Sequence, residues 1–248
     1  MTSALSPGAA MVGRRGSKPA LEVLAAPDFD LEQTLCCGQV FHWVRDGAGW
    51  VGAIGDHAAY VEQRGAELLV PTRFGKTVAR YFALDHPLGE ITASFPNDPA
   101  MEQAAQFCRG LRIIRQPHWE CLATFITSSM KQVAHIAQIS HTLRERFGQR
   151  MEWNGRVIYG YPSAEKLAAL DEKVLRDCSL GYRAKNLLGT ARLVASGSFD
   201  LREIERLDDA GAREALCRLP GVGVKVANCV LLFAYERIRA FPIDVWIE

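Results

Sequence analysis

The chain has almost no excess charge of either sign. Its 248 residues carry 29 lysines and arginines against 28 aspartates and glutamates, a formal net charge of +1. This balance excludes a uniformly basic surface, so any binding to a polyanion must rest on a local basic face and on backbone amides. The apolar content is 48%, which is enough to fill the core of one large or two modest domains.

The sequence also lacks the cysteine spacing of a zinc site or a disulfide framework. Its seven cysteines are odd in number and contain no C-x-x-C pair. Most lie in apolar surroundings, which is typical of buried thiols in a reducing compartment. No apolar run is long enough to span a bilayer, and no secretory signal pattern is present. We therefore expect an intracellular protein that neither contacts a membrane nor holds a metal site.

The pattern of residues divides the chain into three parts and predicts an α+β fold. Residues 1–20 are rich in Ser, Gly, Ala and Pro and read as a disordered leader, either inert or weakly attracted to DNA; we favour the inert reading. Residues 21–96 are predicted to form an N-terminal antiparallel β-sheet domain, with strands over 35–44, 49–54, 58–63 and 67–71. Residues 97–248 are predicted to form an all-α body, with helices near 99–109, 118–129, 132–147, 164–169, 171–177, 183–195, 211–218 and 224–235, and from 244 on.

A glycine turn between two helical stretches dominates the C-terminal part. Pro220 and Gly221 end the first stretch, and an apolar helix begins after Gly223. Both glycines can take backbone angles closed to other residues, so the chain can reverse tightly. Amide groups at such a turn point outward and can bind a phosphate without reading bases. Taken alone, the turn is equally consistent with a simple helix connector.

Lys225 lies in the first turn of that apolar helix. Most lysines are solvated surface residues, and this is the simpler interpretation of Lys225 too. A helix N-terminus and partial burial, however, both disfavour an ammonium group. They favour the neutral amine, which is the form that acts as a nucleophile.

Asp244 follows Lys225 by 19 positions (244 − 225). Its simpler role is to cap a helix that begins at Val245. A carboxylate held by such a cap beside a sugar can also stabilise positive charge that develops on the ribose ring.

Two stretches resemble the helix-hairpin-helix, glycine/proline-rich loop and aspartate signature of DNA glycosylases: Leu219-Pro-Gly-Val-Gly-Val-Lys and Pro242-Ile-Asp-Val. The chain from Phe29 to its end is also similar to the 8-oxoguanine DNA glycosylase family. The further matching stretches are Cys37-Gly-Gln-Val-Phe-His-Trp, Gly110-Leu-Arg-Ile-Ile-Arg-Gln, Glu120-Cys-Leu-Ala-Thr-Phe-Ile-Thr-Ser-Ser, Tyr159-Gly-Tyr-Pro-Ser and Leu180-Gly-Tyr-Arg-Ala-Lys.

The resemblance implies roles for individual residues. It implies that the carbonyl of Gly38 accepts a hydrogen bond from N7–H of 8-oxoguanine, and that Cys229 lines the base pocket. Tyr182 would fill the gap left by the flipped base, and Arg183 would donate to the orphaned base opposite. Simpler roles are a bend at Gly38, core packing for Cys229 and surface positions for the other two.

The sequence departs from the family pattern where the opposite base is held. Three asparagines are usual at the positions of Met130, Lys131 and Gln132, and an arginine at that of His135. The departures predict relaxed discrimination of the base opposite the lesion. Trp246 replaces a histidine that touches a phosphate in many relatives, so that contact becomes at most a neutral hydrogen bond.

The resemblance implies a monomeric bifunctional glycosylase and AP lyase that acts on damaged double-stranded DNA with no cofactor. Lys225 would be the nucleophile and Asp244 the electrostatic stabiliser, while Gly221 and Gly223 would bind a phosphate. One alternative is a related enzyme that removes alkylated purines or oxidised pyrimidines. Another is a non-catalytic DNA-binding module, against which the presence of both Lys225 and Asp244 argues. Because Glu248 falls inside an expected helix, we also expect either a fragment or an incomplete base pocket.

Overall fold

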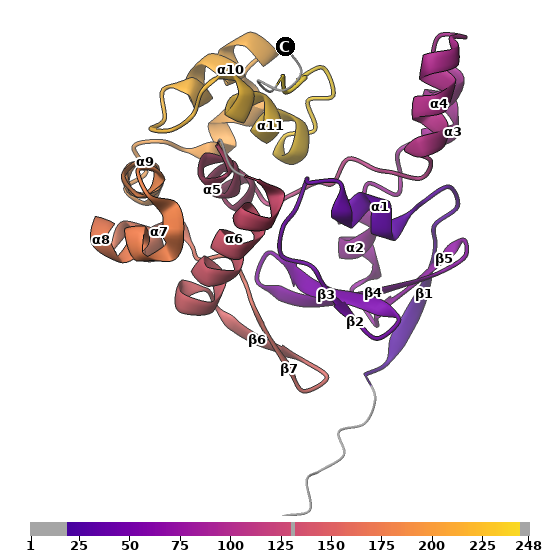
Figure 1. Cartoon of the computed structure of the whole chain (residues 1–248), viewed down its shortest axis with the longest axis horizontal. Coiled ribbons are helices and arrows are strands. Elements are labelled where there is room, and N and C mark those ends of the chain that lie inside the picture. Colours follow the sequence, from indigo (N-terminus) through magenta and orange to yellow (C-terminus); the bar gives the residue numbers. More distant parts are fainter. Residues whose placement is uncertain (1–18, 130–131, 244–248) are drawn as a thin grey trace, which may run out of the picture.

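The computed structural model describes residues 19–129 and 132–243. It consists of a five-stranded antiparallel sheet followed by a larger, mostly helical body (Figure 1). The strands lie in the order β1-β5-β4-β3-β2. Their bounds are β1 (Leu21–Ala25), β2 (Val44–Asp46), β3 (Gly49–Ile54), β4 (His57–Arg64) and β5 (Glu67–Pro71). The predicted α+β class is confirmed.

The strand predicted over 35–44 is wrong. A short helix, α1 (Leu31–Cys36), occupies its beginning, because the carboxylate of Asp30 caps the helix by accepting from the amide of Gln33 at 2.8 Å. Residues 39–43 then form a loop whose side chains are buried, and only β2 joins the sheet. Burial in an irregular loop produced the same apolar pattern as a strand. We call residues 38–43 the Gly38 loop.

The prediction of an all-α body is wrong in one place. The body contains a β-hairpin of β6 (Arg150–Trp153) and β7 (Arg156–Tyr159). Asn154 and Gly155 form its two-residue turn with φ of 46° and 79°, the conformation that Asn-Gly turns favour between twisted strands. The hairpin packs on the sheet, since the ring of Trp153 stacks on Tyr60 at 5.7 Å. It therefore joins the two parts of the molecule.

The helical body is built around α5 (His118–Ser128), in which every residue from 120 to 128 is buried. A helix that is buried on all sides belongs in the centre of a core. The helices around it include α6 (Val133–Phe147), α9 (Arg183–Ala195) and α11 (Val224–Ala234). The remaining ones are α7 (Ala164–Ala168), α8 (Glu172–Leu175) and α10 (Asp209–Cys217). These bounds confirm the helices predicted from 118 to 235.

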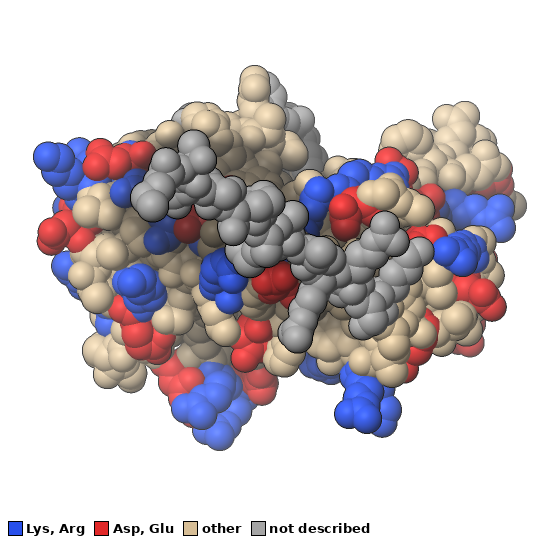
Figure 2. Space-filling view, turned by 90° about the horizontal axis from the view of Figure 1, so that it is seen from below, with Lys and Arg blue, Asp and Glu red and all other residues tan. Residues whose placement is uncertain are grey.

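The N-terminal part contains α2 (Gly75–Tyr81) and α3 (Leu88–Ala93) as well as strands, and α4 (Pro99–Phe107) follows. α3 and α4 have no buried residues and project from the molecule (Figure 1). On the face shown in Figure 2, blue and red side chains are interspersed where residues are described, as the net charge predicts. No helix within the described residues is long and apolar enough to cross a membrane.

Candidate active site

The glycine turn between α10 and α11 is held by α9. Gly221 has φ of +79°, and a Cβ there would lie 2.7 Å from the Cβ of Asn186. Conformation and close approach thus both require glycine at this position. Thr190 donates from Oγ1 to the carbonyl of Pro220 at 2.9 Å, and Pro220 packs against Gly189. The turn is therefore fixed before any ligand arrives.

Gly223 corrects the expectation that both glycines use angles closed to other residues. Its φ of −98° and ψ of −178° are extended and open to any residue. A Cβ at Gly223 would meet nothing within 4 Å, and no side chain caps the start of α11. The absence of a side chain leaves the first turn of α11 open to a close-approaching group, and phosphate binding at Gly221 and Gly223 stays a prediction.

Lys225 is half-buried and lies above a group of aromatic rings. Its Nζ is 5.9 Å from the centroid of the Phe125 ring. That ring stacks on Phe233 at 5.5 Å and meets the edge of Phe41 at 6.5 Å. The Lys225 amine therefore lies beside ring faces and is partly screened from solvent. The three rings come from the Gly38 loop, α5 and α11, so they form a shared apolar floor beside the lysine.

Cys229 lies one turn beyond Lys225 and is 3% exposed. It neighbours Cys121 of α5, whose pKa is raised well above its ordinary value by burial and further by Cys229 and Glu120. Cys121 is therefore a protonated, unreactive thiol that fills the core. Cys229 is thus buried one turn along α11 from the lysine, and direct contact between Cys229 and a base stays a prediction.

The segment that leads to Asp244 is anchored on the lysine helix. Asn228, three residues after Lys225, donates from Nδ2 to the carbonyl of Phe241 at 3.0 Å. Its Oδ1 accepts from Nε of Arg213 at 2.9 Å. Arginine only donates and a carbonyl only accepts, so the two contacts fix the orientation of the amide. Asp244 and Trp246 lie outside the described residues, as do Met130 and Lys131.

Gly38 has φ of +91°, and a Cβ there would meet nothing within 4 Å. Glycine is needed for its backbone conformation and not for lack of space. The next residue, Gln39, is 4% exposed, and its side chain is hydrogen-bonded on both sides to the chain around residues 112 to 114. The orientation of the Gly38 peptide is therefore fixed by its neighbour.

On the side expected to face the orphaned base, Tyr182 is 60% exposed at the start of α9. Arg183 is buried, and its Nε donates to the carbonyl of Ser129 at 2.8 Å while Nη2 also donates to it. The guanidinium thus anchors the connection between α5 and α6, and its donation to an orphaned base stays a prediction. Gln132 is exposed at the N-cap of α6, and His135 is half-buried in the first turn.

Comparison with known proteins agrees with this geometry. The family model described as the 8-oxoguanine DNA glycosylase N-terminal domain matches residues 23–122. The N-glycosylase/DNA lyase OGG1 of Arabidopsis thaliana is 30% identical over 240 residues, which is 90% of this chain and 66% of that protein. The structure of MBOgg1 in complex with a low-affinity DNA ligand superposes with a TM-score of 0.87 at 31% identity, over 93% of this chain and 84% of the other.

The chain belongs to the 8-oxoguanine DNA glycosylase family. The apo form of Clostridium acetobutylicum 8-oxoguanine glycosylase/lyase agrees equally well, with a TM-score of 0.86, 29% identity and coverage of 93% and 85% of the two chains. The chain spans 66% of the length of the Arabidopsis relative.

Three buried amide side chains that connect the elements of this candidate site were not singled out from the sequence. Gln39 and Gln116 lie in stretches that carry the resemblance, but their contact joins residues 77 positions apart, which no local pattern predicts. Asn228 did leave a signal, because it is a polar residue within the apolar run from Val226 to Leu232. A buried amide needs partners, and one of its two partners, the carbonyl of Phe241, lies in the segment before Asp244.

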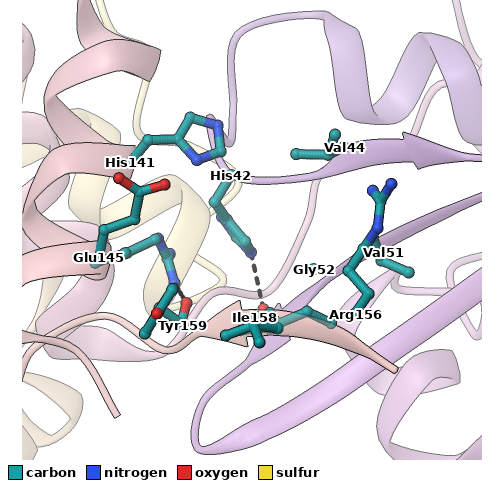
Figure 3. A pocket seen from close by; sticks show the side chains of 12 residues that line it. His42, Val44, Val51, Gly52, His141, Glu145, Arg156, Ile158 and Tyr159 are labelled. Carbon is teal, nitrogen blue, oxygen red and sulfur yellow. Dashed lines mark hydrogen bonds between the residues drawn. The ribbon is translucent and has the colours of Figure 1, made fainter. Parts of the chain in front are cut away.

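A cavity of about 260 Å³ lies apart from Lys225, at the junction of the sheet, α6 and β7 (Figure 3). His42, His141 and Glu145 lie close together along it, and His42 Nε2 donates to the carbonyl of Ala53 at 2.8 Å. Burial, and then Arg144, holds the pKa of His42 well below its ordinary value. His42 is therefore neutral, and this cavity belongs to the contact between the two parts of the molecule.

Proposed function

We propose that the protein is a bifunctional DNA glycosylase and AP lyase that removes 8-oxoguanine from duplex DNA. The observation that carries the proposal is the half-buried Lys225 at the open start of α11, above an apolar floor, in a member of this family. The relatives from Arabidopsis and Clostridium are named N-glycosylase/DNA lyase and 8-oxoguanine glycosylase/lyase. Its partner is damaged double-stranded DNA inside the cell, bound by a monomer.

The reaction begins when the lone pair of the Lys225 amine forms a bond to C1′ of the sugar. The bond from C1′ to the base breaks, and its electron pair leaves with the base, which takes up a proton. Asp244 stabilises the positive charge that develops on the sugar and helps to deprotonate the amine. Opening of the sugar ring gives a Schiff base between Lys225 and C1′. Loss of a proton from C2′ then expels the 3′ phosphate and cuts the strand.

Trapping with borohydride tests this assignment directly. Reduction of the Schiff base is expected to leave a covalent adduct between the protein and an 8-oxoguanine duplex, and Lys225→Gln is expected to abolish it. Lys173→Gln, an exposed lysine of α8, is the matched control and should trap like the unchanged protein. Trapping that survives Lys225→Gln would refute the role of this lysine.

We further propose that the carbonyl of Gly38 distinguishes the lesion from guanine. 8-Oxoguanine carries a hydrogen at N7 and guanine does not. A carbonyl that faces the lone pair of an unmodified N7 is repelled and loses its partner, which costs about 1–3 kcal/mol for a buried group. The left-handed backbone at Gly38 and the buried anchor at Gln39 support this role.

For the opposite strand we propose relaxed discrimination. Gln132 is not the asparagine and His135 is not the arginine of the family pattern, and Met130 and Lys131 depart from it as well. Excision rates of 8-oxoguanine opposite C, A, G and T are therefore expected to be comparable. A strong preference for C in a single-turnover assay would overturn this part of the proposal.

A strand-cleavage assay separates the alternatives. Nicking of an 8-oxoguanine duplex, with none on an intact duplex, is expected. Nicking confined to alkylated purines or oxidised pyrimidines would assign another lesion, and binding without nicking would assign a non-catalytic DNA-binding module.

A further inference from the structure

A buried glutamine fixes the loop that carries Gly38. The side chain of Gln39 lies between this loop and the extended segment before α5. Its Nε2 donates to the carbonyl of Arg112 at 2.8 Å, and its Oε1 accepts from the amide of Ile114 at 2.8 Å. Nε2 also lies 3.3 Å from the carbonyl of Thr34. With donors and acceptors both satisfied, the side chain replaces the backbone pairing that a strand would have supplied.

A second glutamine connects this loop to the helix that carries Lys225. Gln116 is 5% exposed, and its Nε2 donates to the carbonyl of Gln39 at 2.8 Å. Its backbone amide donates to the carbonyl of Phe233, in the last turn of α11, at 2.7 Å. A continuous chain of two hydrogen bonds therefore runs from the residue after Gly38 to α11. We call Gln39 and Gln116 the glutamine bridge.

A series of packed aromatic rings runs beside the glutamine bridge, and both end at Phe233. Phe41 of the Gly38 loop meets Phe125, and Phe125 stacks on Phe233. Lys225 lies over Phe125. The rings separate the Gly38 loop from α11 by a fixed thickness, and the glutamine bridge fixes the position of the loop along that surface.

We propose that Gln39 and Gln116 are specificity-determining positioning residues that hold the Gly38 carbonyl at a fixed place relative to Lys225. The inference rests on the proposed function, in which that carbonyl reads N7–H while the amine attacks C1′ of the same nucleotide. A hydrogen bond of this kind needs a separation of about 2.7–3.2 Å. A shift of the loop against α11 thus removes the contact to the lesion without moving the lysine.

The glutamine bridge is therefore needed to read a base and not to cleave an abasic site. Gln116→Met keeps the length of the side chain and the backbone bond to Phe233, and removes the side-chain amide that donates to Gln39. We expect single-turnover excision of 8-oxoguanine to fall about ten-fold or more, the range that follows from losing one buried hydrogen bond. Strand cleavage and borohydride trapping on a duplex with a preformed abasic site should stay within about two-fold. Gln103→Met, on exposed α4, is the matched control and should change neither activity.

The outcomes separate a positioning role from a structural one. Equal loss of both activities together with a lower melting temperature, or no loss of excision, overturns the proposal. A wild-type protein that neither nicks nor traps abasic DNA would refute the proposed function instead. In that case the positioning role of the two glutamines is tested by binding. The affinity is measured for two duplexes that contain an uncleavable 2′-fluorinated nucleotide, one with 8-oxoguanine and one with guanine. Gln116→Met is then expected to lower the lesion-to-guanine affinity ratio about ten-fold, and an unchanged ratio overturns it.

Discussion

The side of the site expected to read the lesion and the side expected to hold the opposite strand are built differently. On the lesion side, Gln39 and Gln116 are 4% and 5% exposed and are hydrogen-bonded to backbone groups. On the opposite-strand side, Tyr182 is 60% and Val133 is 57% exposed, and Gln132 makes no side-chain cap. Buried, fully paired groups hold one geometry, whereas exposed side chains can adapt. The contrast favours strict reading of the lesion and tolerant reading of its partner.

The largest loss of activity is expected from a substitution of Asn228, on the lesion side of the site. Asn228→Ala removes the hydrogen bond that holds Phe241 three residues before Asp244. Misplacing a catalytic group by about 1 Å can cost about 100-fold in rate, so we expect a loss of that order in single-turnover excision. The affinity for the lesion duplex should change little, because Asn228 is buried and both ends of its amide are hydrogen-bonded to protein groups.

A double-mutant cycle checks this reading of Asn228. In an Asp244→Asn background, Asn228→Ala should cause little further loss, because the two changes act on one group. Tyr235→Phe is the matched control. It removes a hydrogen bond from the residue that directly follows α11, the one from the Tyr235 hydroxyl to the carbonyl of Leu201, and leaves Phe241 untouched. Full additivity of Asn228→Ala and Asp244→Asn would show that the amide acts on stability alone.

A smaller effect is expected from the exposed side at Tyr182. Tyr182→Ala removes the ring that offsets the cost of flipping a base, so excision should fall about ten-fold. The melting temperature should hardly move, because the ring is exposed. Tyr182→Phe keeps the wedge and should excise normally. Unchanged excision by Tyr182→Ala would assign the wedge to another residue.

Two elements of the lesion side differ in how well the sequence predicts them. The turn at Gly221 and helix α11 follow from local rules, because glycine, proline and apolar spacing act within a few residues. The loop after α1 was predicted as a strand because Val40, Phe41 and Trp43 are buried without belonging to one. The partners of Gln39 are set by tertiary contacts far along the chain, which a local pattern does not contain.

The β6–β7 hairpin shows the opposite case. Asn154-Gly155 between alternating apolar residues is a strong local hairpin signal, but it falls between helical stretches and was not recognised. Of the predicted site residues, Lys225 lies over the Phe125 ring, and Cys229 shares α11 with Phe233. Asp244 remains a prediction because it is outside the described residues. The lesion side is thus predictable in its residue types and not in its contacts.

A substitution at position 135 should increase discrimination of the base opposite the lesion. His135→Arg introduces a charged group with several donors, which hydrogen-bonds an orphaned base more strongly than imidazole. We expect the ratio of excision opposite C to excision opposite A to rise about three- to ten-fold, the effect of roughly 1 kcal/mol of discrimination. Gln138→Arg adds the same charge at an exposed position of α6 and controls for general attraction to DNA. An equal change in both variants would remove the special role of position 135.

The smallest effect concerns stability against acid at the junction next to the lesion side. Burial first, and then Arg144, lowers the pKa of His42, and burial lowers that of His141 on α6. The charged side chains that face this junction are Glu120, Arg144, Glu145 and Arg156. In the unfolded chain a histidine takes up its proton near pH 6.5, whereas the folded protein resists protonation until lower pH. The unfolded state therefore binds more protons below that pH, so the stabilisation present above about pH 6.5 is lost as the pH falls toward 5.

We expect the Tm to fall by several degrees between pH 7.5 and 5.5, with a shallower fall in His42→Gln, whose amide can still donate to Ala53. Parallel pH profiles for the two proteins would exclude His42 as the source.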